Sequence, residues 1–284
     1  MSLPIVIGSI YALLSTMFVP LYVRIIYIFC THEDYKLYRS YKLMAQIGLA
    51  QIATFPGQTF IGVAILLGYD WLGIGSVLLK VANSTRKAAA LLGVVLAYER
   101  LIIICGFPEV PHLISVLTIS AWLAAAVNLA VLFSPWTDFY VNPSVFGASF
   151  NSTLPWTAAF DKISYIFFML EAGLTFCAYL VIIGYLLHQK ITTKDLKLTV
   201  NEKSVFVQAF VRFLGDITST SLFHIVLLSH HKSITLRIFT GFVYIINNVV
   251  FPPLMSVAVS RKLRRKVLWS ASNQVENIAL RNTT

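Results

Sequence analysis

The stretch KAAALLGVVLAYERLIIICGF, residues 87–107, decides the fold class of this chain. It is apolar over a length that could cross a bilayer, yet Glu99 and Arg100 stand side by side in its second half. Charged side chains are unfavourable in hydrocarbon, so such a pair lies at a membrane surface or serves a specific purpose. Which of the two applies depends on how many similar stretches the chain contains and on their direction.

The composition of the 284-residue chain is that of an integral membrane protein, because 57% of its residues are hydrophobic and only 12% are charged. Soluble domains carry about 25% charged residues. The net charge of +10 fits inner loops beside anionic lipid, and we expect no nucleic-acid partner because no soluble basic face is present. The three cysteines make no disulfide framework and no metal-ligand spacing occurs, so we expect neither a metal nor a cofactor.

A helix that crosses the bilayer needs about 20 mostly apolar residues. Seven stretches meet this requirement, with polar connectors between them: residues 4–30, 43–67, 76–104, 113–133, 163–187, 204–228 and 236–259. The sequence therefore predicts an all-α integral membrane fold, a bundle of seven transmembrane helices. We expect a single domain over residues 1–284, with a tail at 260–284.

Lysine and arginine residues in the short loops predict the orientation, because they gather on the inner side of membranes. If the amino terminus is outside, the inner segments hold most of the basic loop residues, and only Lys162, Lys232 and Arg237 remain outside. We therefore expect the amino terminus outside and the carboxyl terminus inside. The sequon that begins at Asn151 then lies in the long outer connector, and we expect Asn151 to be glycosylated.

Four stretches of the sequence resemble those of a known receptor family. The similar regions are the start of the second helix (SYKLMAQIGLAQI, 40–52), the end of the third (LLGVVLAYERLI, 91–102), the start of the sixth (NEKSVFVQAF, 201–210) and the end of the seventh (FPPLMSVAVSRKLRRKV, 251–267). Seven spans with Glu99-Arg100 ending the third resemble the rhodopsin-like G-protein-coupled receptors. The chain is most similar to the nematode serpentine chemoreceptors of class T.

This resemblance implies a chemosensory receptor of the plasma membrane, with the sensory ciliary membrane of a neuron as one such location. It would detect a small extracellular ligand and signal through a heterotrimeric G protein. In the inactive state Glu99 would hold Arg100, and on activation Arg100 would meet the G protein. A plainer interpretation of the pair is an arginine that reaches the lipid headgroups beside a neighbouring carboxylate.

Two family features are missing from the sequence. No lysine lies in the hydrophobic part of the seventh span, which excludes a retinal Schiff base. No cysteine stands near Lys80 at the outer end of the third span, so the family's usual bridge to the long outer loop cannot form.

Charged residues within the predicted spans suggest a ligand pocket in the outer part of the bundle. Arg86 lies fourteen positions before Arg100, about 21 Å along a helix and on nearly the same face. Glu171 and Asp216 come to a similar depth on the fifth and sixth spans, and Asn83 lies about one turn from Arg86. We expect Asn83, Arg86, Glu171 and Asp216 to share a polar cavity that binds the ligand, and Arg86 to favour an anionic one.

These charges also have a plainer interpretation as structural ion pairs that never meet a ligand. Arg212 lies four residues before Asp216 and could neutralise it within one helix. Lys80 and Lys87 share a face of the third span nearly opposite to Arg86, so we expect them to meet neighbouring helices or lipid headgroups.

The segment after the seventh span predicts a short amphipathic helix on the inner leaflet. Within SRKLRRKVLW, residues 260–269, Leu263, Val267 and Leu268 fall on one helical face and basic residues cover the rest. The same basic residues also serve as a signal for the inner side of the membrane.

The alternative function is a seven-span ligand-gated channel or transporter subunit. A transporter often has helices broken by glycine or proline in corresponding halves of the chain. Here only TFPGQTF at 54–60 and FPPL at 251–254 are such breaks, and no internal repeat relates them. An enzyme is not expected, because no histidine-rich or paired-carboxylate motif lies at a membrane face.

Overall fold

The computed structural model describes residues 3–151, 153–193, 206–207, 210–211, 213–222, 234–260 and 262–267. Its elements are α1 (Leu3–Met17), α2 (Val19–Thr31), α3 (Glu33–Lys36), α4 (Arg39–Ile52), α5 (Phe55–Leu67), η1 (Trp71–Gly73), α6 (Ile74–Cys105), α7 (Leu113–Leu132), β1 (Phe139–Asn142), η2 (Pro143–Val145), β2 (Gly147–Phe150), α8 (Thr157–Thr193), α10 (Ile234–Ile245), η3 (Ile246–Val250) and α11 (Phe251–Val259). The described residues between 206 and 222 are helical as well, and so are residues 262–267.

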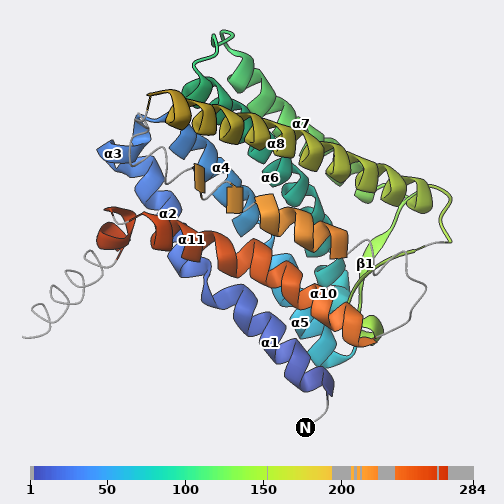
Figure 1. The fold of residues 1–284 in the computed structure, drawn as a ribbon. Helices are drawn as coiled ribbons and strands as arrows, with labels where there is room; N and C mark the ends of the chain where they lie inside the picture. Colours follow the sequence, from blue (N-terminus) through green and yellow to red (C-terminus); the bar gives the residue numbers. More distant parts are fainter. Residues whose placement is uncertain are drawn as a thin grey trace, which may run out of the picture.

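Within the described residues, six helices or runs of consecutive helices are long and apolar enough to cross a membrane. They are Leu3–Thr31, Arg39–Leu67, Trp71–Cys105, Leu113–Leu132, Thr157–Gln189 and Ile234–Val259. Each overlaps one predicted span. The remaining predicted span, 204–228, is described only in part, and its described residues are helical. The chain is therefore a multi-pass membrane protein whose helices form one bundle (Figure 1).

Three of the spans are interrupted near a proline, which begins a new helical segment. Pro20, Pro56 and Pro252 are each the second residue of the downstream segment, in α2, α5 and α11. A proline is tolerated in the first turn of a helix, where its missing N–H is not needed, but not in the interior. The sequence breaks at 54–60 and 251–254 therefore mark new helix starts inside a span. In the last span, a π-helical turn at Ile246–Val250 joins α10 to α11.

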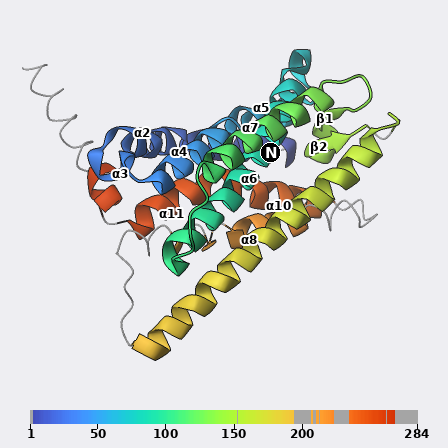
Figure 2. The same cartoon turned by 90° about the horizontal axis from the view of Figure 1, so that it is seen from above.

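Helix α6 is the central helix of the bundle. It packs against α4, α5, α7 and α8 (Figure 2). Small side chains at Ala82, Ala88, Ala89 and Ala97 are buried along it and let the neighbouring helices approach closely. Because α6 is surrounded by other helices, its polar residues point into the protein interior instead of into lipid.

A β-hairpin lies in the long connector between α7 and α8. Strands β1 and β2 pair antiparallel, with Phe139 opposite Phe150 and Asn142 opposite Gly147. The rings of Phe139 and Phe150 lie 4.6 Å apart and hold the open end of the hairpin together. Sequence analysis predicted only a polar connector here, so the hairpin is a small addition to an otherwise helical fold. The end of the bundle that carries it is called the hairpin end, and the opposite end the Glu99 end (Figure 1).

The helix predicted after the seventh span is present at residues 262–267 and is amphipathic. We expected its apolar face to lie on lipid, but the structure buries this face in the protein. Leu263 and Val267 are buried in the same hydrophobic cluster as Phe29 and Tyr35 at the Glu99 end. The burial of both side chains removes the apolar face from lipid, and Lys266 attaches the helix further. The predicted contribution of Leu268 lies outside the described residues.

Lys266 joins this helix to the short α3 segment. Its Nζ lies 2.6 Å from Asp34 Oδ2 and 5.3 Å from the centre of the Tyr35 ring. The lysine charge lowers the pKa of the Asp34 carboxyl, chiefly through this hydrogen bond.

Candidate functional site

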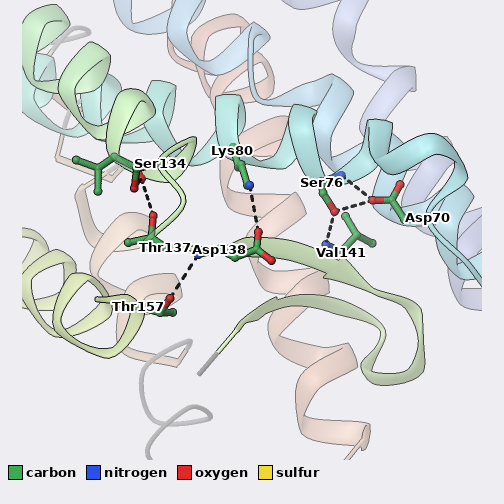
Figure 3. A network of polar contacts seen from close by, with 9 residues as sticks. Asp70, Ser76, Lys80, Ser134, Thr137, Asp138, Val141 and Thr157 are labelled. Carbon is green, nitrogen blue, oxygen red and sulfur yellow. Dashed lines mark hydrogen bonds and ion pairs between the residues drawn. The ribbon is translucent and has the colours of Figure 1, made fainter. Parts of the chain in front are cut away.

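The amino-terminal end of α6 is capped by Asp70 and attached to the hairpin (Figure 3). Asp70 accepts hydrogen bonds from the backbone N–H of Gly75 and Ser76, both at 2.9 Å, and from the Ser76 hydroxyl at 2.6 Å. These bonds satisfy N–H groups that lack partners within the helix. The Ser76 Oγ in turn accepts the backbone N–H of Val141 at 3.1 Å, which fixes β1 over the helix.

A second attachment joins the connector to α6 one turn further along. Lys80 Nζ lies 3.1 Å from Asp138 Oδ1, just before β1. The backbone N–H of Asp138 donates to Thr157 Oγ1 at 3.4 Å, at the start of α8 (Figure 3). All three cysteines are free. Polar contacts therefore hold the hairpin against α6 and the start of α8.

A cavity of about 430 Å³ lies beneath the hairpin. Its walls are formed by residues of α1, α5, α6, α8, the helical segment up to residue 222 and α10, together with the hairpin. Most of its lining surface is apolar. Its charged lining side chains are Arg86, Asp161 and Arg237. The volume is in the range of pockets that bind small organic molecules.

Arg86 is held in this cavity by uncharged groups. Its Nη2 donates to Thr220 Oγ1 at 2.9 Å, and its guanidinium lies 5.0 Å from the centre of the Phe168 ring and 4.7 Å from that of Tyr244. Among the described residues, no carboxylate oxygen lies within 4.0 Å of it. The aromatic faces stabilise the cation without neutralising it.

The structure divides the four predicted pocket residues between two cavities. Asn83 and Arg86 line the large cavity, whereas Arg86, Glu171 and Asp216 line a neighbouring one of about 50 Å³. Asp216 accepts a hydrogen bond from Asn247 Nδ2 at 2.8 Å. The proposed contact between Asp216 and Arg212 lies outside the described residues. Of the four predicted residues, Arg86 alone lines both cavities, together with Phe168 and Thr220.

Lys87 is buried and contacts neighbouring helices, which is one of the two surroundings that the sequence predicted for it. Its Nζ donates to Asn128 Oδ1 of α7 and, at 2.9 Å, to Ser164 Oγ of α8, and it lies 4.6 Å from the centre of the Phe160 ring. Asn128 was not among the predicted functional residues. Its position as a lone amide within an apolar span was the signal that could have drawn attention to it.

At the Glu99 end, the two residues of the pair are adjacent in space and buried. Arg100 Nη2 lies 3.7 Å from Glu99 Oε2, and the exposed fractions of the side chains are 3% and 1%. The buried position does not agree with an arginine that reaches the headgroups. Arg39, which sequence analysis used only to assign orientation, lies with its Nε 3.4 Å from Glu99 Oε1.

Arg39 also reaches the connector between α6 and α7. Its Nη1 contacts Glu109 Oε1. This hydrogen bond with a cation lowers the pKa of the Glu109 carboxyl. Arg39 thus joins the buried carboxylate of Glu99 to the exposed one of Glu109.

Asn151 lies directly after β2, at the hairpin end. Its Oδ1 accepts hydrogen bonds from the backbone N–H of Thr153 at 3.2 Å and from the Thr153 hydroxyl at 2.6 Å. The side chain is partly exposed in a turn, which is the kind of segment that accepts a glycan.

The fold is similar to that of squid rhodopsin. The crystal structure of squid rhodopsin matches with a TM-score of 0.75 and 13% sequence identity, over 92% of this chain and 78% of the rhodopsin chain. No protein-family model and no curated protein sequence matches the chain. The structural likeness confirms the predicted rhodopsin-like fold, a seven-helix bundle.

Proposed function

We propose that this chain is a G-protein-coupled chemosensory receptor that detects a small extracellular ligand and signals through a heterotrimeric G protein. The observation that carries the proposal is the placement of two polar sites on one central helix. Arg86 of α6 lines the cavity beneath the hairpin, and the buried Glu99–Arg100 pair lies toward the other end of α6. A ligand that repacks the surroundings of Arg86 would act directly on the helix that carries Arg100. The rhodopsin-like fold supports the same function.

Glu99 is the residue proposed to hold Arg100 in the inactive state. A buried carboxylate and guanidinium each carry a desolvation penalty of several kcal/mol unless they remain paired. The pair therefore separates only where Arg100 gains another partner, and a bound G protein is the partner proposed here. Such a pair makes α6 a two-state element whose populations a ligand can shift.

The resemblance to nematode serpentine chemoreceptors of class T supports a location in the plasma membrane, with the sensory ciliary membrane as the specialised case. The distribution of basic loop residues supports an extracellular hairpin end. Glycosylation tests this orientation. Asn151→Gln should remove an increase in mass that glycosidase treatment also removes. Asn282→Gln changes the sequon Asn282-Thr283-Thr284, which the predicted orientation assigns to the inner side, and should leave the mass unchanged. Loss of the glycan in Asn282→Gln alone would reverse the proposed orientation.

The test of receptor function is independent of the ligand. The chain is expressed in cells with each of several G-protein α subunits, and basal second messenger is measured at equal surface expression for wild type, Glu99→Gln and Arg100→Ala. Glu99→Gln should raise the signal because it releases Arg100, and Arg100→Ala should remove the signal. Glu33→Gln is the matched control, since Glu33 is an exposed carboxylate at the same end of the bundle.

Equal second messenger in all four proteins with every α subunit would contradict the proposed function. A change in ion flux that differs between the variants, without any change in second messenger, would favour a channel.

A further inference from the structure

We propose that the cavity beneath the hairpin binds small molecules that carry a single carboxylate on an apolar body. The carboxylate would lie against a surface formed by Asn83, Arg86, Ser164 and Thr220, here called the donor wall. All four residues line the cavity. The inference rests on the receptor function proposed above, because it names the class of ligand that the same cavity takes.

The first step concerns the direction of the hydrogen bonds behind Asn83. The Lys87 ammonium can only donate, so the atom of Asn128 that faces it must be the amide oxygen. The Asn128 nitrogen then donates to Ser84 Oγ at 2.8 Å and to Asn83 Oδ1 at 3.3 Å. The acceptor of the Asn83 amide is thereby used inside the protein, and its two N–H donors are left for the cavity.

The same rule applies to the two hydroxyl groups of the donor wall. Ser164 Oγ accepts from Lys87 Nζ at 2.9 Å, and Thr220 Oγ1 accepts from Arg86 Nη2 at 2.9 Å. Neither hydroxyl donates a hydrogen bond to another described residue. Each is therefore polarised by a cation behind it and can offer its O–H to a ligand.

Arg86 supplies the charge of the donor wall. A guanidinium has five N–H donors in a plane, and the described protein uses Nη2 for the contact with Thr220. The rings of Phe168 and Tyr244 lie 5.0 and 4.7 Å away and restrict its orientation. A planar fork that is fixed in this way favours a carboxylate, which can accept two parallel hydrogen bonds.

The rest of the cavity carries no net charge, because its two other charged lining side chains, Asp161 and Arg237, have opposite signs. One carboxylate placed against Arg86 therefore neutralises the lining. Asp161 lines the cavity seven residues before Phe168, which places it about 10 Å along α8 toward the hairpin. Its carboxylate would repel a second anionic group at the far end of a ligand. Apolar side chains also line the cavity, among them Phe139, Phe146 and Phe150. They favour a hydrocarbon body.

The experiment measures binding directly, with the full chain purified in lipid nanodiscs and without G protein. The probes are linear carboxylates from propanoate to octanoate, the alcohol and the amine of each length, and the matching dicarboxylates. At one or more lengths the monocarboxylate should bind at least about tenfold more tightly than the alcohol, the amine and the dicarboxylate, as expected for charge-assisted hydrogen bonds. Nanodiscs without protein correct for partition into lipid.

Variants locate the preference within the cavity. Arg86→Gln should abolish the preference for the acid over the alcohol, and Thr220→Val, which keeps the side-chain shape, should reduce it severalfold. Lys36→Gln removes one positive charge from an exposed site outside the cavity and should leave the preference for the acid unchanged. Thermal unfolding of each variant confirms that it is folded. If Arg86→Gln fails to fold, the comparison of acid, alcohol and amine binding to the wild-type protein still tests the inference.

Tighter or equal binding of the alcohols or amines at every length would overturn the inference, and so would the absence of binding by any acid. A preference that survives in Arg86→Gln would also overturn it. Acid-selective binding without any second-messenger response would leave the inference standing and contradict the receptor function. A second-messenger response to alcohols or amines alone would support the receptor function and overturn the inference about carboxylates.

Discussion

Arg39 Nε lies 3.4 Å from Glu99 Oε1, although the two residues are 60 positions apart in the chain. Glu99 is therefore held between two guanidinium groups, with Arg100 on its second oxygen. Arg39 is shared in turn with Glu109. The charge that Glu99 offers to Arg100 consequently depends on how Arg39 divides its own contacts between two carboxylates.

We predict that Glu109→Gln and Arg39→Gln change basal signalling in opposite directions. Without the Glu109 charge, Arg39 interacts with Glu99 alone and competes with Arg100 for it, so the basal signal should rise roughly twofold, as expected for a partly exposed pair. Without Arg39, Glu99 interacts with Arg100 alone and holds it more firmly, so the basal signal should fall. Second messenger at equal surface expression is the measurement, with Glu33→Gln as control. Changes of the same sign would show that Arg39 does not compete with Arg100.

The Arg39–Glu109 contact should stabilise the protein at neutral pH and lose its effect only in acid. Arg39 lowers the pKa of Glu109 below its ordinary value of 4.5. A lowered carboxyl pKa contributes stability that is present above the ordinary value and is lost as the pH falls through the folded-state value. The difference in unfolding temperature between wild type and Glu109→Gln should thus be constant from about pH 8 to 5 and should disappear below 4.5. A difference that already declines between pH 8 and 6 would point to another group.

The fold was predictable because hydropathy is a local property of the sequence. Residues 113–133 were predicted as a span and form α7, Leu113–Leu132. The face of α6 was predictable as well, since fourteen residues bring Arg86 and Arg100 to nearly the same side of one helix. The hairpin was not, because strands of four residues, FYVN and GASF, carry almost no periodic signal.

The partners of the charged residues were not predictable, because they come from distant parts of the chain. Lys87 meets Asn128 across 41 positions, and no sequence pattern relates them. The expected cluster of Arg86 with Glu171 and Asp216 rested on depth alone, and depth does not fix the rotation of a helix. In the structure Arg86, Glu171 and Asp216 all line the smaller cavity, but the direct contacts of Arg86 are with Thr220 and two aromatic rings.

Lys87 and Asn128 should behave as one buried unit in a double-mutant cycle. Lys87→Met leaves the Asn128 oxygen buried without a donor, which should destabilise the protein by about 1–3 kcal/mol. Asn128→Leu leaves the Lys87 charge without its amide partner, at a cost of roughly 3 kcal/mol or more. The double variant should be more stable than the sum of the two losses predicts, because neither polar group remains. Unfolding in detergent measures all three, and strict additivity would show that the two side chains act independently.

Gly241 should tolerate alanine far less well than Gly173 does. A Cβ at Gly241 of α10 would overlap with the Tyr11 hydroxyl, whereas one at Gly173 of α8 would meet no atom within 4 Å. Tyr11 cannot move freely, because it is buried, donates to the Ile238 carbonyl at 3.0 Å and packs edge-on against Phe242. Gly241→Ala should therefore destabilise the protein by about 1–3 kcal/mol.

Gly173→Ala is the matched control, since both residues are glycines within membrane-spanning helices. It should be neutral or stabilising by up to about 1 kcal/mol, because alanine favours the helix. Tyr11 also lines the cavity, so its displacement in Gly241→Ala should weaken binding of the carboxylate probes as well. Unfolding in detergent and probe binding are measured on the same preparations. Equal stability of the two alanine variants would mean that α1 and α10 do not approach as closely as the contact between Tyr11 and Gly241 requires.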